Sequence, residues 1–272
     1  IEERAVPRSE MPGEETWPTQ PFPTKPPPFA RQKFTADDLN PYMSAEDRAH
    51  WRDEVLSARN EGLFTPPGLR PTIEMPGNNG GANWGGAAVE PSAGMLYIVS
   101  KDLPAILRLV PDPGAPTGVR YTSGFGLITV SNGLSLIGPP WSSLTAYDLN
   151  QGTIKWKIAL GNVPELAAKG VKDTGSHYPK VGPVVTAGGL LFAGTRDRTV
   201  RAFDVETGKA LWEHDVDAAL EGIPAVYEIG GREFIVFCAS AQAGLTPATQ
   251  GAISGAYVAF ALPAARRTTA DR

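Results

Sequence analysis

Two stretches with the same pattern, LTAYDLNQGTIKW at 144–156 and VRAFDVETGKALW at 200–212, decide the fold class. Each contains alanine, an aromatic residue, aspartate, an aliphatic residue, two polar residues, glycine and finally tryptophan, and the copies are offset by 56 residues throughout. A degenerate third copy, YVAFALP at 257–263, follows at an offset of 57. A repeat of this length indicates a chain built from similar units that stack on one another.

The repeat around Gly208 has the signals of a four-stranded antiparallel meander. The runs GPVVTAGG and LLFAGT meet at a glycine turn, and TVRAFDV is joined to ALWEHDV by ETGK. In a unit of about 40 residues, we expect the aspartate to accept hydrogen bonds from the following turn, Gly208 to adopt a positive φ and Trp212 to pack against the neighbouring unit. Units of this kind are the blades of a β-propeller.

Residues 80–263 are therefore expected to form an all-β structure, a partial β-propeller of about three four-stranded blades. The blades are expected at about 80–160, 180–217 and 222–262, with the last one incomplete because the chain ends without its fourth strand. A long excursion at 101–143 interrupts the first blade. Propellers close with roughly four to eight blades, so we expect the remaining blades to lie in sequence outside these residues or in a partner chain.

Residues 1–79 are expected to hold a Pro-rich arm, one long helix and a loop insertion. The arm contains PTQPFPTKPPPF, in which prolines fix φ and remove donors, so it is expected to lie on the surface as an extended strap. The helix is expected to begin after Ser44 as N-cap, with acidic residues in its first turn. Residues 264–272 are expected to be a C-terminal tail.

Composition excludes several classes of protein. A formal net charge of -4 without a long basic run argues against a nucleic-acid partner. The single cysteine, Cys238, lies in an apolar run and is expected to be a buried hydrophobe, and it allows no disulfide within the chain. No apolar run is long enough to span a bilayer. Because the sequence begins at Ile1 without methionine, we expect an N-terminal part with any targeting segment to lie outside it.

The loops that surround the channel of a propeller are the places to seek a site. The sequence has no zinc spacing, phosphate-binding loop, nucleophile elbow or EF-type calcium loop. The loops expected at one face of the blades carry amides, flat aromatics and cations, which suit a planar anionic ligand. They contain Asn83, Trp84, Trp141, His177, Tyr178, Lys180, Arg196 and Arg198. Two alternatives stay open here, namely that the tryptophans pack between blades and that the arginines lie on a solvated turn.

The ordered set of motifs resembles the C-terminal half of pyrroloquinoline quinone (PQQ)-dependent dehydrogenases, in the membrane-bound glucose and polyol branch. The stretches that carry the resemblance cover nearly the whole chain and include GGANWGGAAVEPSAGMLYIVSKDLPAILRLVP, PPWSSLTAYDLNQGTIKWKIALG, GPVVTAGGLLFAGTRDRTVRAFDVETGKALWE and the arm. The resemblance implies an eight-bladed quinoprotein propeller with PQQ on its axis and a calcium ion beside it. It also implies a sugar or polyol substrate, and electron transfer to a membrane quinone or cytochrome. The implied location is the periplasm, with association to the inner membrane through a segment not present here.

The resemblance carries over to few residues. The family's Asn-Trp pair beside the cofactor maps onto Asn83 and Trp84, and the loop TGSHYPKVGP places Tyr178 and Lys180 as cofactor or substrate contacts. That loop departs from the family pattern by one inserted residue and by the loss of an Asn and a Gly, and the loop at 240–255 lacks the family's Gly-His segment. The catalytic base and calcium ligands are expected upstream, so this chain is assigned none, and alone it is expected to be inactive.

A non-catalytic propeller that serves as a binding module or scaffold is the alternative. Such a protein would have the same blades as the enzyme. The two loops that depart from the family pattern are as consistent with it as with an enzyme whose base lies elsewhere. An Asp base and calcium ligands in the upstream loops would favour the enzyme, and their loss would favour the scaffold.

Overall fold

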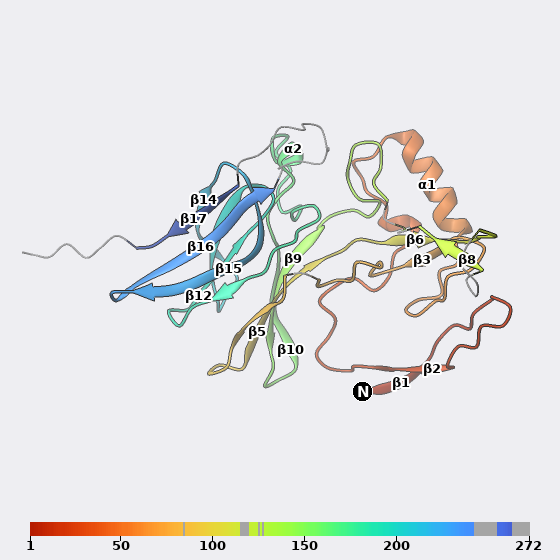
Figure 1. The fold of residues 1–272 in the computed structure, drawn as a ribbon, viewed down its shortest axis with the longest axis horizontal. Coiled ribbons are helices and arrows are strands. Elements are labelled where there is room, and N and C mark those ends of the chain that lie inside the picture. The colour runs from red at the N-terminus through yellow and green to blue at the C-terminus, as the bar shows by residue number, and fades with distance from the viewer. Residues whose placement is uncertain (84, 115–119, 125, 127, 242–254, 263–272) are drawn as a thin grey trace, which may run out of the picture.

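The computed structural model describes the chain except for residues 84, 115–119, 125, 127, 242–254 and 263–272. Its main feature is a set of three antiparallel sheets that lie beside one another, with the arm and helix region packed next to the first (Figure 1). The first sheet, in the order β10-β9-β5-β4, consists of β4 (Ala87–Glu90), β5 (Met95–Lys101), β9 (Ser142–Asp148) and β10 (Thr153–Ala159).

The other two sheets follow the same plan. The second, in the order β11-β12-β13-β14, consists of β11 (Val184–Val185), β12 (Leu190–Gly194), β13 (Thr199–Asp204) and β14 (Ala210–Asp215). The third, in the order β15-β16-β17, consists of β15 (Ala219–Ile229), β16 (Arg232–Ala241) and β17 (Ala256–Phe260). The all-β partial propeller is thereby confirmed, with three strands of the last blade among the described residues, and the exact domain boundaries stay predictions.

The repeat motif folds the same way in both complete blades. Asp204 Oδ1 accepts hydrogen bonds from the backbone N–H groups of Glu206 and Thr207 at 3.1 and 2.8 Å, and Asp148 Oδ1 accepts one from Gln151 at 3.0 Å. Gly152 and Gly208 have φ of 68° and 71°. The outer strand of each of these two sheets also bulges directly before its tryptophan, at Lys155 in β10 and at Leu211 in β14. Local chemistry that recurs at the same offset therefore builds the same turn and the same bulge twice.

The tryptophan of the first blade forms the seam with the second. Trp156 donates from Nε1 to the carbonyl oxygen of Val205 at 2.9 Å, and its indole covers Gly208. A Cβ at Gly208 would lie 2.8 Å from the indole, so the turn needs glycine for space as well as for φ. Trp212 repeats the arrangement, with its ring 5.3 Å from that of Phe260 in the third sheet. The expected packing of this tryptophan on the next blade is confirmed.

Glycines of the stretch 80–86 serve contacts within the protein. A Cβ at Gly85 would overlap the carbonyl oxygen of Val181, and one at Gly182 would overlap that of Gly85, because the inner strands β4 and β11 bring their backbones together here. Between the second and third sheets, Gly182 donates its backbone N–H to the Gly222 carbonyl at 3.1 Å. The inner strands β4, β11 and β15 thus lie next to one another, as the blades of a propeller require.

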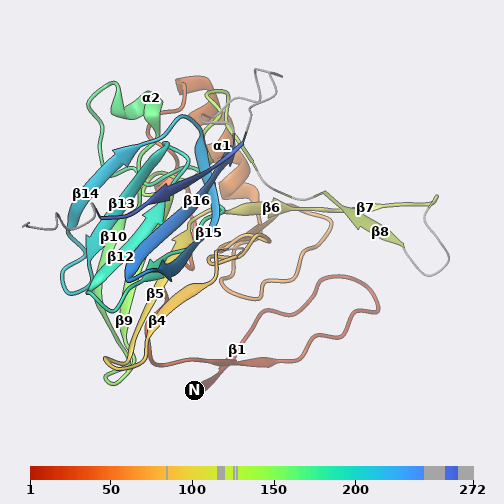
Figure 2. The same ribbon diagram turned by 60° about the vertical axis from the view of Figure 1, so that its left-hand side comes forward.

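Two hydrophobic cores fill the spaces between consecutive sheets. The core between the first and second sheets is centred on fully buried Tyr97, Leu144 and Leu191. The core between the second and third includes Leu220 and Phe237. Figure 2 shows the sheets stacked face to face, with the hairpin of β7 (Leu109–Pro111) and β8 (Tyr121–Ser123) projecting away from them.

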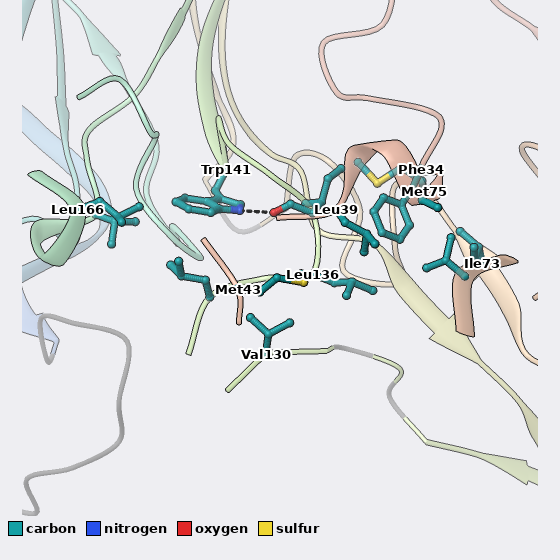
Figure 3. Packing of buried hydrophobic residues seen from close by; sticks show 14 residues of the cluster. Phe34, Leu39, Met43, Ile73, Met75, Val130, Leu136, Trp141 and Leu166 are labelled. Carbon is teal, nitrogen blue, oxygen red and sulfur yellow. Dashed lines mark hydrogen bonds between the residues drawn. The ribbon is translucent and has the colours of Figure 1, made fainter. Parts of the chain in front are cut away.

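A third core joins the N-terminal region to the excursion of the first blade (Figure 3). It contains Phe34, Met75, Leu136 and Trp141, and the last of these is fully buried and donates from Nε1 to the Ile137 carbonyl at 2.7 Å. The elements in this region are β1 (Glu2–Ala5), β2 (Thr19–Phe22), a 3-10 turn (Ala36–Asp38), α1 (Ala45–Ser57), β3 (Thr72–Glu74), β6 (Ala105–Leu107) and α2 (Pro164–Ala167).

The helix and arm differ in part from expectation. Ser44 caps α1 by accepting a hydrogen bond from Asp47 N at 3.0 Å, as expected. The four-residue α2 is an additional short helix, and β1 and β2 pair within the arm that was expected to be irregular. The arm crosses the first blade as a strap, since Pro27 and Phe29 carbonyls accept hydrogen bonds from Tyr147 Oη and Lys157 Nζ, both at 2.5 Å.

Candidate functional site

One pocket lies where the inner strands of the first two blades meet, and it is called the inner pocket below. Its lining comes from the loop before β4, the end of β5 and the loop before β11, and consists of Gly81, Asn83, Val99, Ser100, Lys101, Pro179 and Val181. The segments are held together by the backbone, because Lys101 N donates to the Gly81 carbonyl at 2.8 Å and Gly222 N to that of Lys180 at 2.8 Å. The pocket therefore sits at the place where a propeller binds ligands near its axis.

Lys101 is a buried cation in this pocket. Its side chain is 2% exposed and Nζ has no hydrogen-bond partner among the described residues. Burial, and after it the positive charge of Lys180, lowers the pKa of the Lys101 ammonium. The adjacent carboxylate does not neutralise it, since Asp102 accepts hydrogen bonds from Arg31 N and Nε at 2.9 and 2.8 Å. A buried ammonium without a partner indicates a place for an anion.

Tyr178 flanks the cation. Lys101 Nζ lies 5.7 Å from the centroid of the Tyr178 ring, within the range of a cation–π contact. Asn79 Nδ2 donates to Tyr178 Oη at 2.5 Å, and the backbone of Tyr178 has a φ of 55°. Burial raises the pKa of the Tyr178 hydroxyl although the Asn79 contact opposes it. A left-handed conformation at a non-glycine residue costs about 1 kcal/mol, which supports a specific role for the position of this ring.

His177 is neutral at physiological pH. Burial, and then the charge of Arg196, lowers its pKa to about 4, and its buried Nε2 has no partner among the described residues. Its ring meets that of Trp141 edge to face at 5.9 Å and lies 6.2 Å from that of Tyr178. A neutral imidazole with a free ring nitrogen can accept or donate one hydrogen bond to a ligand or water.

The structure brings some of the expected site residues together and separates others. Asn83 lines the inner pocket with Lys101, and Lys180 is exposed beside the lining residues Pro179 and Val181. Trp84 lies outside the described residues, as does most of the loop at 240–255. Trp141 belongs to the third core, and Arg196 pairs with Glu221 at 3.4 Å. Packing, the alternative left open for Trp141, is therefore its role.

Two residues of the site were missed by sequence reasoning. Lys101 ends the run MLYIVSK, a context typical of an ordinary cation at the end of a strand. Asn79 lies in GNNGG, a context typical of a turn. The signal that could have found Lys101 is its position at the end of the second strand of a blade, beside the loop that delivers Asn83. Its burial depends on residues about 80 positions away, which no local pattern reveals.

Neither a metal cluster nor a membrane helix is found in the described parts of the chain. Within the described ranges, no three His, Cys, Asp or Glu side chains converge on a common point. None of the helices in those ranges has the length and hydrophobicity needed to cross a bilayer.

A comparison with protein families decides the identity of the fold. A family model described as "PQQ: Glucose/ethanol/alcohol dehydrogenase, beta-propeller domain" matches residues 1–235. The chain belongs to this family. Membership among the quinoprotein dehydrogenases, expected from the ordered motifs, is thereby confirmed, and PQQ is the cofactor for which the family is named.

Relatives of the PQQ family lie in the branch that the motifs indicated. The probable quinate dehydrogenase (quinone) of Xanthomonas campestris pv. juglandis is 29% identical over 97% of this chain and 36% of its own length. The quinoprotein glucose dehydrogenase of Escherichia coli (strain K12) is 30% identical over 96% of this chain and 35% of its own length. This chain therefore spans about a third of the length of these relatives.

A solved structure supports the fold. The quinohemoprotein alcohol dehydrogenase from Comamonas testosteroni superposes with a TM-score of 0.52 at 21% identity, covering 75% of this chain and 29% of that chain. At this identity the likeness shows the propeller fold alone.

Proposed function

We propose that the complete protein containing this chain is a PQQ-dependent dehydrogenase that oxidises a sugar or polyol. The observation that carries the proposal is the inner pocket of a family member, where the Asn83 amide and an unpartnered buried ammonium line one space. PQQ is a planar quinone that carries carboxylates, so it needs hydrogen-bond donors at its edge and cations near its acids. The donor set of this pocket fits that requirement.

Each residue of the pocket has a separate task in this proposal. When bound, PQQ supplies the two-electron acceptor for alcohol oxidation. Asn83 donates or accepts at the edge of the ring, and Lys101 and Lys180 supply positive charge. Tyr178, held by Asn79, forms part of the wall. The general base and the calcium ligands come from blades outside these residues, and electrons leave to a membrane quinone or a cytochrome.

Reconstitution tests the proposal. The complete protein is prepared without cofactor, supplied with PQQ and calcium, and assayed by dye reduction with glucose, quinate and glycerol. Turnover that requires PQQ on at least one of these substrates is expected. An absence of PQQ-dependent turnover on every sugar, polyol and alcohol tried would remove the enzyme and leave the non-catalytic scaffold. Fractionation of cells tests the proposed periplasmic location at the inner membrane.

Asn83→Ala is the local test of the cofactor site. Loss of one hydrogen bond is expected to weaken PQQ binding about fivefold. Asn150→Ala is the matched control, because Asn150 lies at the opposite end of the same sheet, where its Nδ2 donates to the Ala93 carbonyl at 3.0 Å. Equal PQQ affinity in the two variants would remove Asn83 from the site.

A further inference from the structure

We propose that Lys101 is a carboxylate-binding residue and that it makes the inner pocket an anion site. This inference rests on the proposed function, because it names the chemistry that the same pocket recognises. A carboxylate can reach it from two sources, the acid groups of PQQ or the acid group of a hydroxy-acid substrate such as quinate.

The Lys101 ammonium has no hydrogen-bond partner in the part of the chain that the structure describes. Lys101 is 2% exposed, and beside the apolar residues Val99, Pro179 and Val181 the pocket is lined by the polar residues Asn83 and Ser100, neither of which hydrogen-bonds the ammonium. The backbone of Gly81 packs against the arm, since a Cβ added at Gly81 would lie 2.6 Å from Ala30 Cβ. Water is therefore partly excluded from a charge that no hydrogen bond satisfies, which strengthens its attraction for an anion.

The charges around Lys101 also select an anion. None of the lining residues of the inner pocket is acidic, and Asp102 is occupied by Arg31. Lys180 adds a second positive charge whose influence reaches Lys101. The Tyr178 ring at 5.7 Å offers only the weak attraction of its face. A carboxylate fits better than a neutral hydroxyl, because it accepts a charge-assisted hydrogen bond and neutralises the ammonium.

Three forms of the complete protein test the inference: wild type, Lys101→Met and the control Lys209→Met. Methionine keeps the unbranched shape and most of the length of the side chain and removes the charge. Lys209 is exposed in the turn before β14 and its ammonium makes no hydrogen bond or ion pair with the described residues, so the control makes the same change in net charge away from the pocket. Lys101→Gln is measured alongside and carries the same readouts if the methionine variant does not fold.

The first readout is the dissociation constant of PQQ for the cofactor-free protein in calcium. A weakening of about 10- to 100-fold in Lys101→Met alone assigns the carboxylate to the cofactor. The second readout is kinetic. Unchanged PQQ affinity with a KM for quinate raised about tenfold, and KM for glucose unchanged, assigns the carboxylate to the substrate. If both PQQ affinity and the quinate KM equal those of Lys209→Met, the inference is overturned.

A third readout separates this inference from the proposed function. Citrate, a plain carboxylate, is added to the cofactor-free proteins and the midpoint of thermal unfolding is measured. A rise in wild type and in Lys209→Met that disappears in Lys101→Met supports the anion site even if the wild type binds no PQQ and oxidises no polyol. Equal shifts in all three proteins, or none in any, contradict it.

Discussion

The two most buried cations of the blades, Arg201 and Lys101, have opposite surroundings. Arg201 lies at the seam between the first two blades, where it donates to Asp197 at 2.6 Å, to Glu213 at 2.9 Å and to Thr195 Oγ1 at 2.9 Å. Asp197 in turn accepts from the Asn162 backbone of the first blade at 2.9 Å. Lys101 lies in the inner pocket and has no hydrogen-bond partner among the described residues.

The difference separates stability from binding within one fold. At the seam every charge is compensated by another part of the chain, so the seam contributes to folding. In the inner pocket the compensation is left to a ligand, so the same kind of buried charge opposes folding until the ligand arrives. Regions with unsatisfied buried polar groups are therefore the regions in which to seek function in this molecule.

Arg201→Met is expected to have the largest effect on stability. It leaves the Asp197 carboxylate buried without its partner, so the free energy of unfolding of the cofactor-free protein should fall by about 3 to 5 kcal/mol. Chemical denaturation measures the change. The same substitution at Lys101 is the control and should be neutral or stabilising, because it removes an uncompensated charge. A loss as large as that at Arg201 would show that Lys101 is paired in the folded protein, and the contrast would not hold.

Gly208→Ala tests the seam at its turn. Alanine at a φ of 71° costs about 1 kcal/mol, and its Cβ would lie 2.8 Å from the Trp156 indole, so a total loss of about 2 to 3 kcal/mol is expected. Gly152→Ala is the matched control, because it has a φ of 68° in the equivalent turn but meets only the Lys25 side chain at 3.3 Å. Equal losses at the two glycines would mean that indole packing adds nothing at the seam.

The buried ring of His177, next to Tyr178, is expected to make the stability of the protein depend on pH. The His177 pKa is lowered to about 4 in the folded protein from an ordinary value of 6.5, so the unfolded chain binds more protons between these values. The contribution is fully present above pH 6.5 and is lost as the pH falls toward 4, by about 3 kcal/mol. The difference in unfolding free energy between wild type and His177→Gln, followed across this range, measures it. A difference that does not change with pH would contradict the buried neutral ring.

Lys155→Met is expected to have the smallest effect. Lys155 Nζ donates to Glu206 at 2.5 Å across the outer rim of the seam, where solvent screens the pair. The change in unfolding free energy should stay below about 0.5 kcal/mol and should vanish in high salt. A larger loss of unfolding free energy that persists in high salt would show that the paired charges at the surface of the seam also stabilise the protein.

The blades could be predicted from sequence because their determinants are local. The Asp and Gly of each turn act within four residues, and strand alternation needs no knowledge of the partner, so the expected strand TVRAFDV at 199–205 agrees with β13 to one residue. The hairpin of the arm was not predicted from the sequence, because β1 pairs with a segment about 17 residues away that contains Pro21, a residue that is rare inside paired strands. The short α2 has too few residues to show a helical period.

The site was predictable only where a motif marks it. Asn83 follows from its place in GGANWGG, and the structure puts it in the inner pocket. The burial of Lys101 and Trp141 depends on distant segments, Pro179 and Val181 in one case and Phe34 in the other, so their roles could not be inferred from neighbouring residues. Gly85 of the same motif is required where two backbones meet, which its neighbours in sequence do not indicate.

The seam of Trp156 with Gly208 also bears on how such a chain could grow in evolution. Each of the two complete repeats carries a tryptophan that packs on the following unit and a glycine turn, and Gly208 is the turn on which the tryptophan of the preceding unit packs. Tandem duplication of one unit therefore copies a complete, self-matching interface, and a new copy can join the array without a compensating mutation. Divergence is then free to act on the inner loops, where only one or two units need to bind a ligand.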